Sequence, residues 1–295
     1  MSAQEAPAEL VGAPAAPAPR RLAFSSPACL CCISELPEHL RFNAFVHRGY
    51  RCGLGTRAAA RSMCRLHNES LNIWTHAVAC AFACAALCVP LAPEATGLWH
   101  LALRCCATAP MVLSFGLSVI YHTFLAHKCC STSKRGCENY HRLLSCDVAG
   151  VVGVLSVPQV AILCYGFGNQ PTLRDALLAL SAIAAAVGSR AVRSVDQTAR
   201  AVPLSVLLLT RWLCLALRLL HYGLRCDAAT GIYARMELLL ALGGAANALF
   251  LPERWCPGRL DYALNSHQIM HLCTTATAVM VVRALQADIA CAAGV

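Results

Sequence analysis

The segment RCCATAPMVLSFGLSVIYHTFLA, residues 104–126, decides the fold class. Between Arg104 at its start and His122 near its end it carries no charged side chain, and as a helix it is long enough to cross about 30 Å of hydrocarbon. Six other apolar segments of similar length occur in the chain, so we expect membrane spans at about 72–92, 104–126, 143–166, 173–191, 201–221, 232–251 and 267–288. The sequence therefore predicts an all-α fold, a seven-transmembrane helix bundle.

The composition agrees with a membrane protein. Of the 295 residues 58% are hydrophobic and only 13% are charged, about half the charged share of an ordinary soluble domain, and the mean hydropathy is +0.56. These values exclude a soluble enzyme, a disordered scaffold and a collagen-like chain. The net charge of +9 does not indicate a nucleic-acid partner, because the basic residues lie between apolar runs rather than in one patch.

The 20 cysteines do not predict a disulfide framework. Nine of them fall inside apolar runs, where cysteine behaves as a small hydrophobic residue, and no pair of CxxC motifs is present.

The chain divides into three regions. Residues 1–34 are Ala- and Pro-rich and are expected to be a disordered tail, residues 35–70 a cytosolic amphipathic segment, and residues 71–290 the bundle. Within the second region, 35–50 suits a short amphipathic helix against the membrane or the bundle. No signal peptide is expected, because the first long apolar run begins near residue 71. The N-terminal region is a candidate surface for protein partners. It contains a cysteine-rich patch, Cys29, Cys31 and Cys32, which is either acylated, a metal-binding site or simply unstructured.

The distribution of basic residues orients the bundle. If the N-terminus is cytosolic, 17 of the 24 lysines and arginines fall on the inner side. We therefore expect the N-terminus in the cytosol and the C-terminus outside, the reverse of a heptahelical G-protein-coupled receptor. The triplet Asn68-Glu69-Ser70 matches a glycosylation acceptor, but on the cytosolic side it should stay unmodified.

Four ionisable side chains are expected at one depth in the inner half of the bundle. His122 lies about 6 Å from the inner end of its span, Asp147 about one turn into the next, and His267 and His271 in the first turns of the last span. Because His267 and His271 are spaced i and i+4, they share one helix face. Together with His122 they predict a three-histidine zinc site with an open fourth position.

Two further residues complete the predicted site. Asp147 is placed to hold or deprotonate a water on the metal, and Ser118, one turn from His122, to orient that imidazole or donate to an oxyanion. The alternative is that each histidine only packs or hydrogen-bonds. We expect His76 to be a packing residue, and Arg211 and Glu237 to pair with each other or line a cavity.

The same residues resemble the signature motifs of the progestin and adipoQ receptor family. The motifs are HNESLNIWTH (67–76), Ser118-x-x-x-His122, Asp147, and PERWCPGR (252–259) running into HQIMH (267–271), and the resemblance extends over about residues 35–290. Val148 follows Asp147 where the family often has an aromatic residue, and the N-terminal tail lies outside the match.

The resemblance implies seven spans, a cytosolic N-terminus and a zinc ion held by His122, His267 and His271 near Asp147. Members of the family are described as receptors for adiponectin or progestins, and ceramide hydrolysis is attributed to the adiponectin receptors. We therefore expect a zinc-dependent hydrolase of sphingolipid amides, with ceramide or another sphingolipid as substrate or ligand. The alternative is a receptor or regulatory scaffold with a structural zinc site. The short spans favour the Golgi or endoplasmic reticulum over the plasma membrane.

Overall fold

The computed structural model describes residues 30–93, 95–130, 133–194 and 196–294. Within them the chain is helical and forms no strand, with two isolated β-bridges, Cys31 to Tyr50 and Leu54 to His127. The all-α prediction is confirmed for this part of the chain. Most of the predicted tail, including Cys29, lies outside the described residues.

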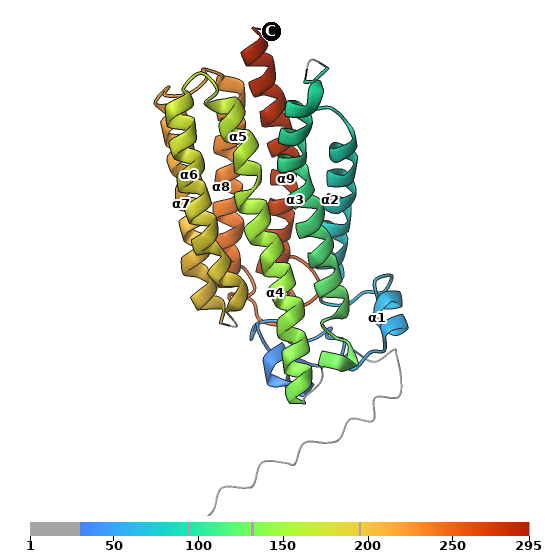
Figure 1. The fold of residues 1–295 in the computed structure, drawn as a ribbon. Coiled ribbons are helices and arrows are strands. Elements are labelled where there is room, and N and C mark those ends of the chain that lie inside the picture. Colours follow the sequence, from blue (N-terminus) through green and yellow to red (C-terminus); the bar gives the residue numbers. More distant parts are fainter. Residues whose placement is uncertain (1–29, 94, 131–132, 195, 295) are drawn as a thin grey trace, which may run out of the picture.

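Long helices run side by side along one axis (Figure 1). They are α2 (Ser70–Cys88), α3 (Gly97–Phe124), α4 (Lys134–Ser156), α5 (Pro158–Gly166), α6 (Pro171–Gly188), α7 (Gln197–Leu219), α8 (Asp227–Leu249) and α9 (Ser266–Ala293). The first turns of α9 lie at the end of the bundle that carries α1 (Thr56–Ser62), here called the α1 end; the opposite end carries the C-terminus (Figure 1).

Six helical stretches of the described chain are long and apolar enough to cross a membrane. They are α2, α3, α4 with α5, α6 with the following 3-10 turn, most of α7, and α9. α4 and α5 stack end to end around Val157, because Pro158 lacks the N–H that would continue the ladder. The remaining long helix, α8, has the length of a span but carries Asp227, Arg235 and Glu237.

Every predicted span coincides with one of these helices, or for the third with α4 and α5 together, and the two largest differences are early starts. The third starts at Lys134 rather than near 143, after Ser133 caps it by accepting a hydrogen bond from the Gly136 N–H. Its first turns are polar, so hydropathy detects only the apolar part. Likewise α3 starts at Gly97 rather than near 104.

The predicted amphipathic helix at 35–50 is not present. The segment contains two 3-10 turns, η1 (Ile33–Glu35) and η2 (Glu38–Leu40), followed by irregular chain. Pro37 restricts the residue before it and offers no N–H, which breaks an α-helix at this point. Three of its apolar side chains are nevertheless buried against the α1 ends of α3 and α4: Leu36, Leu40 and Val46 share a cluster with Tyr121, Leu125 and Tyr140.

Residues 30–34, which we assigned to the tail, are also held in place. The Cys31 N–H donates to the Tyr50 carbonyl over 2.7 Å, and the Tyr50 N–H donates back over 3.2 Å. The ordered segment therefore begins before the boundary that composition suggested.

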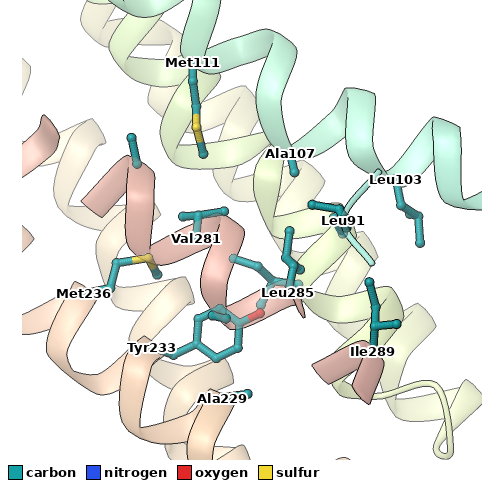
Figure 2. Packing of buried hydrophobic residues seen from close by; sticks show 14 of the residues in the cluster. Leu91, Leu103, Ala107, Met111, Ala229, Tyr233, Met236, Val281, Leu285 and Ile289 are labelled. Atoms are coloured by element: carbon teal, nitrogen blue, oxygen red, sulfur yellow. The ribbon is translucent and has the colours of Figure 1, made fainter. Parts of the chain in front are cut away.

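The largest buried cluster fixes α9 among its neighbours. Figure 2 shows Ala107 and Met111 of α3 beside Val281 and Leu285 of α9, with Met236 of α8 on the other side. A disulfide between Cys226 and Cys291 joins the start of α8 to the end of α9. One disulfide thus exists where we expected no framework. This packing seats the first turns of α9 against α2 and α3.

Candidate metal centre

Three histidines from two helices meet at the α1 end of the bundle. His122 comes from the last turn of α3, and His267 and His271 from the first turns of α9. One potential ligand atom from each lies within 4.8 Å of the others. His122 and His271 are buried and His267 is half-buried. The structure therefore brings together the three residues that the sequence predicts as ligands.

In all three histidine rings the Nδ1 atom faces an oxygen that can accept a hydrogen bond. The pairs are His122 with Glu69 Oε2 (2.7 Å), His267 with Asn247 Oδ1 (3.1 Å) and His271 with the Asn72 carbonyl (3.2 Å). Because these oxygens accept, each Nδ1 carries the proton and each Nε2 keeps a free lone pair. Such second-shell hydrogen bonds are typical of histidines that ligate a metal.

The spacing of the Nε2 atoms fits a zinc ion. Those of His122 and His267 lie 3.4 Å apart, and two lone pairs at that separation repel each other unless a metal ion or a proton lies between them. Two ligands at 2.0–2.1 Å on a tetrahedral zinc are about 3.3–3.4 Å apart. Three neutral imidazoles are also the donor set of zinc sites that keep a fourth position open. The residues present therefore suit zinc.

Glu69 is the supporting residue that sequence reasoning missed. It lies just before α2, is 3% exposed, and also accepts a hydrogen bond from Asn72 Nδ2 over 2.6 Å. Burial alone would raise the pKa of Glu69, but its hydrogen bonds with His122 and Asn72 and the nearby imidazoles lower that pKa to about 2. It is therefore an ionised carboxylate against a ligand imidazole. We interpreted it only as part of a glycosylation triplet; the signal was an acidic residue at the start of a span, at the depth of the histidines.

Replacing Glu69 with glutamine should weaken zinc binding about 10- to 100-fold. The amide keeps the shape but loses the negative charge that makes the His122 imidazole more basic. Competition with a chromophoric chelator measures the affinity, with Glu138→Gln on the exposed face of α4 as the matched control. Equal affinities in both variants would show that Glu69 does not support the ligand.

Asp147 and Ser118 lie beside the cluster. Asp147 is half-buried, and Ser118, which is 2% exposed, lies close to its carboxylate. Among the described residues Asp147 is not a member of the group of ligand atoms within 4.8 Å. Glu69, rather than Ser118, therefore occupies the position at the His122 ring that we expected Ser118 to take. Since Asp147 and His267 are the less buried members, the exposed side of the site lies at these two residues.

Other predicted polar residues have separate places. His76 stacks on His271 with ring centroids 3.6 Å apart and planes 9° apart, so it packs directly against a candidate ligand. Arg211 and Glu237 pair with each other, Nη2 to Oε1 at 2.5 Å. Asn68 is 3% exposed, which leaves no room for a glycan on its side chain.

The fold and the site define a class, a multi-pass helical membrane protein with a three-histidine cluster at one end of the bundle. Residues 64–282 match the family model described as Haemolysin-III related. The chain therefore belongs to this family. Proteins named as progestin and adipoQ receptor family members are among its similar relatives.

Individual relatives agree with this membership. The chain is 34% identical over 241 residues to "Progestin and adipoQ receptor family member 4" of Mus musculus, covering 80% of this chain and 84% of the relative. The protein of the same name in Homo sapiens is 34% identical over 239 residues, with the same coverage. The "Adiponectin receptor protein" of Drosophila melanogaster is 29% identical over 271 residues, covering 84% of this chain and 57% of the relative. The resemblance stated from the motifs is confirmed.

Proposed function

We propose that this protein is a zinc-dependent membrane hydrolase that cleaves sphingolipid amides, converting ceramide to sphingosine and a fatty acid. The observation that carries the proposal is the convergence of the potential ligand atoms of three histidines near Asp147 and Ser118. A relative named as an adiponectin receptor adds support, because ceramide hydrolysis is the activity attributed to those receptors.

The residues divide the chemistry between them. His122, His267 and His271 would hold the ion, and Glu69, Asn72 and Asn247 fix their rings. Zinc, when bound, supplies Lewis acidity that polarises a carbonyl and acidifies water.

The proton transfers fall to Asp147. A carboxylate oxygen takes a proton from the water that attacks the amide carbonyl and then delivers it to the departing amine nitrogen. The Ser118 hydroxyl lies near enough to donate a hydrogen bond to that carboxylate and so to orient it. These residues lie on spanning helices, so an amide-linked lipid is a substrate that reaches them from the bilayer.

Turnover of a labelled ceramide by purified protein tests the proposal. We expect release of the fatty acid, its loss on treatment with a strong chelator, and its return on adding zinc. Phosphatidylcholine of the same acyl length is the control substrate. Zinc-loaded protein that hydrolyses no ceramide, with His271→Ala behaving like the wild type, would overturn the enzymatic function.

We propose a seven-span topology, with α8 as the additional span and the N-terminus in the cytosol. Two observations support it: the excess of basic residues on the α1 side, and the Cys226–Cys291 disulfide at the opposite end. Disulfides persist in oxidising compartments, which lie outside the cytosol.

Thiol labelling of sealed membranes checks this orientation. Exposed Cys64, which follows α1, and exposed Cys129, in the 3-10 turn after α3, should react with an impermeant maleimide only from the cytosolic side. Cys226 and Cys291 should react only from the other side, after reduction. Variants that each retain a single reactive site separate the signals. The reverse pattern would contradict the proposed topology.

A receptor or scaffold with a structural zinc site is the second candidate. The three histidines and their acceptors connect α2, α3, α8 and α9, an arrangement in which metal binding contributes folding energy. In that case replacing Asp147 would either lower the stability of the protein or have no effect.

A further inference from the structure

A second group of buried charged residues lies away from the metal centre, between α5, α7, α8 and α9. Arg211 of α7 pairs with Glu237 of α8, and Arg218 of α7 binds Asp288 of α9 through two hydrogen bonds of 2.9 and 2.6 Å. Tyr233 also donates to Asp288 over 3.1 Å. The proposed hydrolysis uses none of these residues.

The group is remote from the histidines. At 1.5 Å per residue, Glu237 is about 15 Å along α8 from Asn247, the partner of His267. By the same measure Asp288 is about 25 Å along α9 from His271. The charged group therefore belongs to the half of the bundle nearer the C-terminal end, as the course of α9 in Figure 1 shows.

A hollow of about 290 Å³, including the part that opens outward, adjoins these residues. Its walls combine the charged residues Arg211, Arg218 and Glu237 with the polar Gln159 and with apolar side chains such as Met236. A neighbouring hollow of about 180 Å³ shares Gln159 and Arg211 and includes Ser181. Polar lining thus continues from one hollow into the next at membrane depth.

Three atoms of the residues that line the first hollow lack a hydrogen-bond partner. They are Arg211 Nε, Arg218 Nε and Glu237 Oε2, on side chains that are 5%, 4% and 6% exposed. Buried polar atoms are normally satisfied, and an exception points to an unobserved partner. Here two N–H donors and one carboxylate oxygen acceptor lack a hydrogen-bond partner.

The charges select the chemistry of that partner. Each arginine already faces a carboxylate, so the lining is electrically balanced, and a charged guest would lack a counter-ion in a medium of low dielectric constant. A hydroxyl group can accept from an arginine Nε–H and donate to the free carboxylate oxygen at the same time.

We propose that the hollow between α5, α7 and α8 is a binding site for an uncharged hydroxyl group, bridging Glu237 Oε2 and the arginine Nε atoms. Its two sources are water, for which the enclosed part of the hollow, with about 20 Å³ open to the centre of a water molecule, is large enough, and the alcohol of a membrane lipid. The site is separate from the proposed hydrolysis and does not depend on it.

Near-atomic structures in lipid nanodiscs distinguish the sources. One sample contains phosphatidylcholine with diacylglycerol, which has a free hydroxyl, and the other phosphatidylcholine with triacylglycerol, which has none. Density within hydrogen-bond distance of Glu237 Oε2 and an arginine Nε is expected. An isolated peak in both samples identifies water, and a peak continuous with acyl density in the diacylglycerol sample identifies a lipid alcohol. An empty hollow in both samples would overturn the proposal.

Substitution of the acceptor provides a second test. Glu237→Gln can replace the free carboxylate oxygen by an NH₂ donor, so it should lose the density and any rise in Tm that diacylglycerol gives the wild type, whereas Glu138→Gln should keep both. If Glu237→Gln does not fold, Cys214→Leu, which fills the hollow with hydrocarbon, is used in its place. Unchanged density in Glu237→Gln, or in Cys214→Leu where that variant is used, would contradict the assignment. Neither readout involves ceramide hydrolysis, so the outcome is independent of the proposed enzyme function.

Discussion

Purified His271→Ala protein is expected to lose its zinc. The apparent binding free energy of a four-ligand zinc site is roughly 10–16 kcal/mol, so each ligand contributes about 3 kcal/mol, and removing one should weaken binding about 100- to 1,000-fold. His271 is 2% exposed and its Nδ1–H is held by the Asn72 carbonyl, so its ring is fixed in the site. Zinc per chain after dialysis against a weak chelator measures the effect.

His47→Ala is the matched control, because His47 is exposed and lies outside the cluster. It should keep the zinc content of the wild type. Should His271→Ala retain as much zinc as His47→Ala, the three-histidine cluster is not the metal site.

Asp147→Asn is expected to lower ceramide turnover about 100- to 10,000-fold, the usual contribution of a general acid–base residue. The amide is isosteric but cannot take up the proton of the attacking water. Because Asp147 is not among the candidate ligands, zinc content should be unchanged, and because it is only half-buried, the Tm should be close to that of the wild type.

The matched control is Asp175→Asn, an exposed carboxylate on α6. It should leave activity, zinc content and Tm unaltered. A collapse of stability in Asp147→Asn would favour the structural role, and full activity in that variant would remove Asp147 from the mechanism.

Much of the fold could be predicted from the sequence because a lipid solvent imposes a simple rule on spanning segments. Each apolar run had to form a helix that satisfies its own backbone, and each does. The start of α4 at Lys134 could not be predicted from hydropathy because the first turns of this helix are polar. The segment 35–50 escaped for a different reason: its apolar residues are buried by tertiary contacts with Tyr121, Leu125 and Tyr140, which local periodicity does not contain.

The candidate ligands could be predicted because topology sets their depth. His122 ends one span, and His267 and His271 begin another that starts from the same side, so their levels coincide. The supporting residues could not be found in this way. Whether Glu69 or Ser118 meets the His122 ring depends on how α2 and α3 are rotated against each other, and the approach of Asn247 to His267 depends on the loop between α8 and α9.

The Cys226–Cys291 disulfide also could not be predicted from the sequence. Its two cysteines lie 65 residues apart in the sequence, and among 20 cysteines no spacing motif singles them out. Only the antiparallel packing of α8 on α9 places them together.

X-ray absorption at the zinc edge of purified wild-type protein tests the central claim most directly, because it identifies the metal and its ligand atoms in one experiment. We predict about one zinc per chain, with nitrogen and oxygen neighbours at about 2.0–2.1 Å and the multiple-scattering signature of imidazole. Folded protein without zinc, or zinc bound by sulfur at about 2.3 Å, would contradict it.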